Sequence, residues 1–184
     1  NWARGNYGAN ASLGKMKTPG DSESGVGDNS PHWNNGKRRG VMGANASLTI
    51  GEIKDGTSNT ILLAELRAGV VEFDARGVWA MSGGCPSALW AHGTGFDANG
   101  PNSPSAEADD ITACDDVRNA VGGAAALQKM GMPCASGSRA NYQQTSRSQH
   151  TGGVYVALGD GSVRMISDYV NIVGSSGKMS VWDK

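Results

Sequence analysis

The sequence predicts a single α+β domain built from an antiparallel sheet, short helices and long loops. Two apolar-rich runs flank Asp160-Gly161, and a third, mostly apolar run stands at residues 60–66. The 28 glycines are roughly twice the average usage, and without a strict period they indicate turns and loops. Five tryptophans and the aliphatic runs supply a core, so residues 1–184 are expected to form one loop-rich globular domain.

The strongest local signal is a hairpin with Asp160-Gly161 at its tip. A two-residue type I′ turn needs positive φ at both central positions, and Asp-Gly is a preferred pair for it. With this tip, Leu158 pairs with Val163 and Val156 with Met165. Alternation places these four side chains on one face, which is interpreted as the core face.

The N-terminal third contains two near-repeats, residues 4–13 and 39–48, which are identical at eight of ten positions. Two copies are too few for a solenoid, so the copies are expected to run side by side in equivalent loop and strand settings. The polar stretch between them, residues 15–38, is typical of a surface loop. Its only large aromatic residue, Trp33, would pin this loop to the body or contact a neighbouring molecule.

The middle of the chain contains one short helix and several candidate strands. Thr49 and Glu52 form a capping-box pattern that predicts one or two helical turns, ended by Asp55-Gly56. Residues 60–66 are interpreted as a buried strand, although periodicity does not exclude a helix. Short strands are also expected at 70–73 and 77–81, the second with Trp79 in the core. Residues 83–112 are loop-rich, and the roughly helical stretch 115–130 is weakened by Gly122-Gly123.

Several motifs of the chain point to one family of proteins. His150 is followed after nine residues by Asp160-Gly161. A second stretch contains Asp55, Gly56, Ser58, Asn59 and Glu65, and the segments 77–80, 89–93 and 99–103 extend the pattern over nearly the whole chain. These motifs resemble the C-terminal and central motifs of the DUF1559 family, bacterial exported proteins with a pilin-like character.

The resemblance implies the globular domain of a pilin-like or pseudopilin-like structural protein, at the bacterial cell surface or outside the cell. Its partners would be copies of itself, as in a filament, or other envelope components. Full family members begin with a prepilin-type helix, but this chain has no run of about eighteen apolar residues and no signal-peptide core. The chain is therefore interpreted as a processed or truncated product, with membrane contact only through that helix.

Neither nucleic-acid binding nor catalysis is predicted. With a net charge of −1, the chain has no excess of basic residues that would favour nucleic-acid binding. His150 and Asp160 invite a catalytic reading, but an extended strand between them spans roughly 17–20 Å, whereas base catalysis requires contact at about 3 Å. Asp160 is therefore assigned to the turn and His150 to a hydrogen bond at the strand entry. The 55–60 turn lacks a phosphate-loop lysine pattern, and it too is interpreted as structural.

The alternative hypothesis is an extracellular module that binds a glycan or another ligand, with Ca²⁺ as a candidate cofactor. Candidate oxygen ligands come from Asp97, Asn99, Asn102 and Asp109, which do not fit the twelve-residue EF-hand pattern. An ordinary solvated acidic loop, in which Asp and Asn form turns, is the favoured explanation. The candidate ligand-stacking residues are Trp33, Trp90 and the neighbouring His92.

Three cysteines, Cys85, Cys114 and Cys134, leave one without a partner. No CxxC spacing indicates zinc. In an exported protein one disulfide is expected; all three pairings are open, and Cys114–Cys134 is favoured. Three reduced buried thiols are the other possibility.

Overall fold

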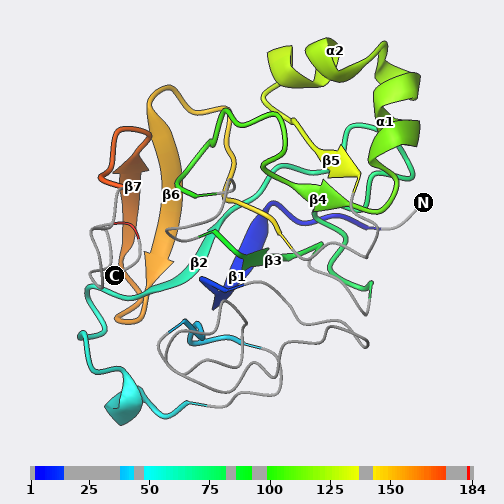
Figure 1. Ribbon diagram of the computed structural model, residues 1–184. Helices are drawn as coiled ribbons and strands as arrows, with labels where there is room; N and C mark the ends of the chain where they lie inside the picture. Colours follow the sequence, from blue (N-terminus) through cyan, green and yellow to red (C-terminus); the bar gives the residue numbers. More distant parts are fainter. Residues whose placement is uncertain are drawn as a thin grey trace.

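The computed structural model describes residues 3–14, 38–43, 48–81, 86–92, 99–136, 143–172 and 182. The main sheet has five strands in the order β3-β1-β2-β6-β7 (Figure 1). They are β1 (Tyr7–Ser12), β2 (Ile61–Glu65), β3 (Ala88–Trp90), β6 (Gly153–Leu158) and β7 (Val163–Ser167). β1 and β3 are parallel, while the other neighbours are antiparallel. The α+β class is therefore confirmed, but the sheet is mixed and not purely antiparallel.

A smaller lobe lies at the upper end of the sheet in Figure 1. It contains the helices α1 (Cys114–Val121) and α2 (Ala124–Lys129) and a two-stranded parallel sheet of β4 (Asp110–Ile111) and β5 (Ala135–Ser136). Gly122, with φ of +93°, ends α1 in the left-handed conformation. The two glycines thus divide the predicted helical stretch into two helices.

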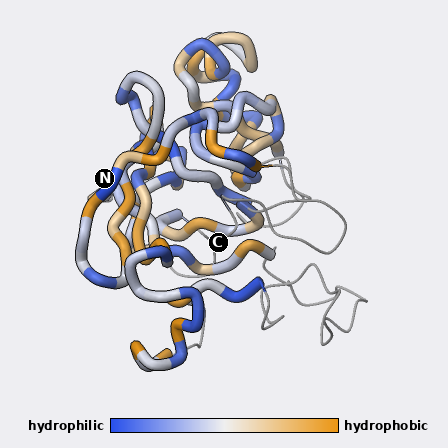
Figure 2. Tube along the Cα trace, turned by 90° about the vertical axis from the view of Figure 1, so that its left-hand side faces the viewer, coloured by the Kyte–Doolittle hydropathy of each residue, from blue (hydrophilic) through white to orange (hydrophobic). Residues whose placement is uncertain are grey.

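Each lobe has its own apolar core. The residues that fill the core of the large sheet are Ala64, Leu66, Leu89, Val154, Val156 and Leu158. The small lobe packs Ile111, Cys114, Val117, Leu127, Met132 and Cys134. Figure 2 shows that hydrophobic and hydrophilic segments alternate along the trace. No helix in the described ranges combines the length and apolar character needed to span a bilayer.

The predicted hairpin forms between β6 and β7, but its register is one residue off the prediction. Ala157 pairs with Val163 and Tyr155 with Met165, so the loop has three residues, 159–161. Only Gly161 in this loop has positive φ, +83°. The Asp160 carboxylate accepts hydrogen bonds from the N–H (2.9 Å) and hydroxyl (2.7 Å) of Ser162. This geometry is a three-residue loop with one left-handed residue.

The register shift overturns part of the predicted core. Val163 and Met165 lie on the face opposite to Val156 and Leu158, and their side chains are 65% and 43% exposed. A shift by one residue moves every side chain of a strand to the other face. The assignment of Val163 and Met165 to the core is therefore wrong.

The segment after β2 also differs from the prediction. Residues 70–73 and 77–81 form turns, with Val78 as an isolated bridge to Arg4, and not strands. Trp79, expected in the core, is 66% exposed. The capping box is confirmed: in the 3₁₀ helix η1 (Ile50–Glu52), the Glu52 carboxylate accepts a hydrogen bond from the Thr49 N–H (2.7 Å).

The two near-repeats meet, as expected, but not in equivalent settings. Arg39 bridges Ser12, and the Gly40 N–H donates to the Ala11 carbonyl (2.9 Å). A Cβ at Gly40 would lie 2.2 Å from the Asn10 carbonyl oxygen, which explains the glycine. The first copy is strand β1, whereas Val41 and Met42 form a turn. Residues 44–47 and the loop with Trp33 lie outside the described residues.

Candidate functional site

The motif residues lie at both ends of the ladder between β2 and β6. At one end, the hairpin tip rests on the turn that precedes β2. The Gly159 N–H donates to the Thr60 carbonyl (2.9 Å) and the Asp160 N–H to the Thr57 carbonyl (3.1 Å). A Cβ at Gly159 would lie 3.0 Å from the Thr57 carbonyl oxygen, so glycine permits this close approach.

The turn before β2 is closed by its own hydrogen bonds. The Asn59 side-chain amide donates to the Asp55 carbonyl (3.1 Å), and the Asn59 N–H donates to the Gly56 carbonyl (3.0 Å). Gly56 has φ of +87°, which favours glycine at this position. Ser58 and Asp55 are exposed at its surface. These contacts support a structural turn.

At the other end of the ladder, the Glu65 carboxylate clamps the start of β6. It accepts a hydrogen bond from the Tyr155 N–H (2.7 Å) and contacts the His150 Nε2 (3.0 Å). The His150 ring stands edge-on to the Tyr155 ring, with centroids 5.1 Å apart. Glu65 is only 7% exposed, so this carboxylate is bound where the backbone ladder ends.

The clamp holds the chain together and presents no nucleophile. His150 and Asp160 lie at opposite ends of β6. The Ser148 hydroxyl donates to the Gly153 carbonyl (2.6 Å) and accepts from the His150 N–H (3.1 Å), so it is engaged with the backbone. The sequence resemblance identified Glu65 and His150 separately, but nothing in the sequence indicated their contact across 85 positions.

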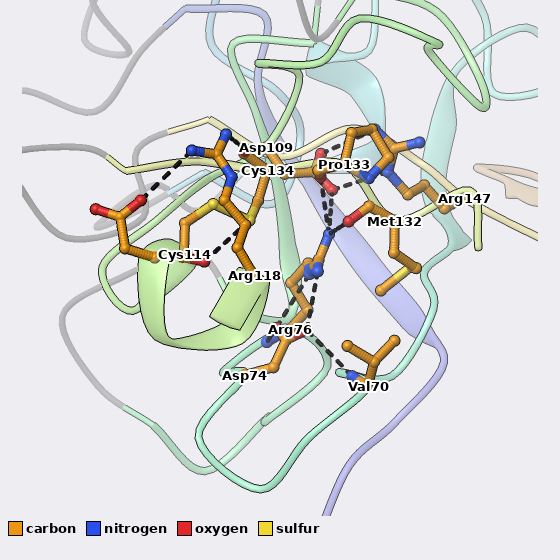
Figure 3. Close-up of a disulfide and its surroundings, with 11 residues drawn as sticks. Val70, Asp74, Arg76, Asp109, Cys114, Arg118, Met132, Pro133, Cys134 and Arg147 are labelled. Carbon is orange, nitrogen blue, oxygen red and sulfur yellow. Dashed lines mark hydrogen bonds and ion pairs between the residues drawn. A yellow bond between two sulfur atoms is a disulfide. The ribbon is translucent and has the colours of Figure 1, made fainter. Parts of the chain in front are cut away.

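A buried ionic network joins the two lobes (Figure 3). Arg76 binds Asp74 through Nε (3.0 Å) and Nη2 (2.8 Å), and binds Asp109 through Nη1 (3.0 Å). The Nε of Arg147 donates to Asp109 (2.8 Å). All four side chains are almost completely buried. Because buried charges are tolerated only when paired, the two acids and two bases form one structural unit.

The pKa shifts within this ionic network follow from the pairing. Burial alone raises the pKa of Asp109, but the Arg147 and Arg76 guanidinium groups more than offset this and hold it below its ordinary value. Burial lowers the pKa of Arg76, yet Asp74 and Asp109 reverse the effect and raise it. Both shifts favour the charged forms.

Arg76 and Arg147, together with two further arginines, also bind the connection between α2 and β5. Five consecutive carbonyls, Met130–Cys134, each accept a hydrogen bond from a guanidinium group, and we call them the arginine-bound segment. The donors are Arg67, Arg76, Arg118 and Arg147. The predicted disulfide between Cys114 and Cys134 is confirmed and anchors this segment to α1 (Figure 3). Cys85 lies outside the described residues.

The calcium hypothesis fails at Asp109. Its two oxygens accept hydrogen bonds from Arg147, Arg76 and the Thr145 N–H (3.2 Å), which leaves no place for a cation. Within the described residues, no three acidic, histidine or cysteine side chains are grouped to hold a metal ion. Asp97 lies outside these residues.

The other two candidate ligands for calcium are tied to neighbouring chain segments. The Asn102 Oδ1 accepts from the Ser148 N–H (2.9 Å), and its amide donates to Asp168 (2.8 Å). The amide of Asn99 donates to the Ile172 carbonyl (2.7 Å). Both asparagines therefore join segments that are far apart in the sequence.

Trp90 and His92 are buried and do not form a stacking surface for a ligand. They are 4% and 2% exposed, respectively. The His92 Nε2 contacts the Asn10 Oδ1 (3.1 Å), and Trp182 donates from its indole nitrogen to the His92 carbonyl (2.7 Å). The predicted ligand-binding role of Trp90 and His92 is therefore wrong.

Removal of the Glu65 clamp should destabilise the fold. We expect Glu65→Ala to lower the free energy of unfolding by about 1–3 kcal/mol, because the Tyr155 N–H and His150 lose the carboxylate that they contact. Urea denaturation measures this loss. The control, Glu72→Ala on an exposed turn, should stay within about 0.5 kcal/mol of wild type. Equal stability of the two variants would argue against a structural clamp.

Comparison with known proteins identifies the family. The model for the family described as "Protein of unknown function (DUF1559)" matches residues 4–172, which include both ends of the β2–β6 ladder and the ionic network. No curated protein and no solved structure shows significant similarity to the chain. The chain therefore belongs to the DUF1559 family.

Proposed function

We propose that this chain is the displayed domain of an exported, pilin-like structural protein without catalytic activity. It acts by packing against an apolar helix and, through it, by assembly with copies of itself or with other envelope components. The observation that carries this proposal is the face of the five-stranded sheet that points away from the core. We call it the outer face and define it by two rows of side chains.

The first row crosses the whole sheet and contains only apolar residues. Residues that are directly opposite on neighbouring strands share a face. The successive pairs are Ala88 with Ala9, Ala9 with Leu63, Leu63 with Ala157 and Ala157 with Val163. Ala9, Leu63, Ala88 and Ala157 are partly exposed to solvent, and Val163 is exposed.

The second row contains Tyr7, Glu65, Tyr155 and Met165, again in directly paired positions. Three of these are large apolar or aromatic side chains with substantial exposure. The one acid, Glu65, is buried, where it accepts a hydrogen bond from the Tyr155 N–H and contacts His150. A contiguous exposed patch of this kind marks an interaction surface.

The outer face is better suited than the edge of the sheet to contact another molecule. Arg164 on the edge strand β7 is opposite Val156, so it stands on the core side of the sheet. Charged residues that point inward on an edge strand oppose pairing with another strand. We therefore expect contact through the outer face.

A long apolar helix of the prepilin type suits this surface. Full members of the family are expected to carry such a helix at the N-terminus, and the alanines of the first row leave room for its close approach. The disulfide supports export, since disulfides persist mainly in oxidising compartments. The motif residues support a structural role, since their side chains and backbone groups bind each other at the two ends of β2.

The glycan-binding alternative has less support, because Trp90 and His92 are buried. Trp33 and Asp97, the other residues on which it depends, lie outside the described residues.

A charge on the outer face should disrupt assembly without disturbing the fold. In the full protein expressed by its native cells, we expect Val163→Glu to reduce the envelope-retained and sheared-filament fractions by about tenfold or more, because an unpaired charge is costly to bury. Immunoblots of fractionated cells measure this reduction. The control is Ile50→Glu in η1, whose side chain is 76% exposed. Equal retention of both variants would refute contact through the outer face.

A further inference from the structure

The charges around the arginine-bound segment do not balance. Arg76 and Arg147 are compensated by Asp74 and Asp109. Arg67 also reaches this segment, but it forms no ion pair with any carboxylate of the described residues. Among the described residues, the charge of Arg67 therefore has no directly paired carboxylate.

Arg67 lies beside the arginine-bound segment and is partly exposed, whereas Arg147 is buried. It follows β2, and its Nη1 donates to the Met130 carbonyl, while Arg147 donates to the next carbonyl, that of Gly131 (3.3 Å). A Cβ at Gly131 would lie 3.4 Å from the Arg67 Nη1, so glycine at this position adds no side chain against the guanidinium group. A guanidinium has five N–H donors, and most of those of Arg67 remain available.

The surroundings also raise the positive potential at this point. Burial lowers the pKa of Arg67, and the charges of Arg147 and Arg76 lower it further. A bound anion would relieve this repulsion. Guanidinium groups match phosphate and carboxylate oxygens in a forked, two-bond geometry.

We propose that Arg67, beside Gly131, binds an oxyanion, that is, a phosphate or carboxylate group. The site lies at the junction of the lobes and does not use the outer face. It would give the domain a contact with an acidic small molecule or polymer that is independent of helix packing. The competing explanation is that Arg67 serves only to cap the carbonyl after α2.

The test uses the purified chain and measures the thermal midpoint against inorganic phosphate and, separately, acetate, with chloride used to keep the ionic strength constant. We expect a saturable rise for wild type with at least one anion, and a loss of apparent affinity of about tenfold or more in Arg67→Gln. Arg164→Gln on β7 is the matched control, because it removes the same charge from an exposed arginine on another element. Any general salting effect would appear equally in both variants.

Arg67→Lys separates charge from geometry and should give an intermediate affinity, because lysine keeps the charge but not the fork. A parallel titration with polyphosphate distinguishes the sources of the anion. If polyphosphate shifts the midpoint through Arg67 and inorganic phosphate does not, the oxyanion belongs to a polymer. The absence of any saturable shift in wild type, or an equal shift in Arg67→Gln, would refute the site.

Discussion

Replacement of Asp109 by asparagine is expected to lower the free energy of unfolding by about 3–5 kcal/mol. Asparagine keeps the shape of the side chain but removes the charge that Arg76 and Arg147 share. Arg147 would then be a buried cation without a carboxylate, and Arg76 would keep only Asp74. Urea denaturation followed by tryptophan fluorescence measures the loss.

The control for this experiment is Asp115→Asn. Asp115 is mostly exposed and lies 3.4 Å from Arg118 within α1. Exposed ion pairs contribute about 0–1 kcal/mol, so this variant should remain close to wild type. Similar losses of unfolding free energy in the two variants would mean that the buried network does not stabilise the junction between the lobes.

The acid dependence of stability gives a second measure of the same network. The pKa of Asp109 is held below its ordinary value, so the unfolded chain binds the proton more tightly than the folded one. Its contribution is therefore complete above about pH 4, the titration range of a free aspartate, and is lost as the pH falls further. The difference between wild type and Asp109→Asn should shrink over that acid range. A difference that stays constant would contradict the pairing.

Local patterns predicted β2 and the β6–β7 hairpin but not the register of that hairpin, and the strands that they predicted at 70–73 and 77–81 are turns. The apolar run at 60–66 became β2, and Asp160-Gly161 became the tip of the β6–β7 hairpin. In the observed loop the Asp160 carboxylate binds Ser162, and only Gly161 has positive φ. Dipeptide preferences do not include that side-chain contact, and the error of one residue concealed the outer face.

The contacts of the site could not be predicted for a different reason. Asp74, Arg76 and Asp109 stand in polar stretches that are typical of loops, and each partner lies far away in the sequence or in an irregular turn. Burial of a charge becomes favourable only when its partner is present, so no single residue signals it. The Cys114–Cys134 disulfide could be predicted from the sequence, because three cysteines allow only three pairings.

Removal of the disulfide should be nearly as costly as removal of Asp109. The bond joins residues separated by 20 positions, and the loss of such a loop constraint corresponds to about 3 kcal/mol in the chain-entropy model. We expect the double variant Cys114→Ala, Cys134→Ala to lose that amount in urea denaturation. The reduced wild-type chain should show a similar loss. Unchanged stability in both would indicate that the arginine contacts alone hold the small lobe.

The disulfide and the ionic network act on the same five residues, so their contributions should not add. Cys134 is the last residue of the arginine-bound segment, and Arg76 binds the carbonyls of Met132 and Pro133 just before it. If either constraint is removed, the arginine-bound segment can detach more easily from its neighbours. The remaining constraint then contributes less to the free energy of unfolding. Groups that share one segment commonly show coupling of about 0.5–3 kcal/mol. The triple variant that combines Cys114→Ala, Cys134→Ala and Asp109→Asn should therefore be more stable than the sum of the separate losses predicts. Strict additivity of the losses would mean that the two lobes are held at independent points.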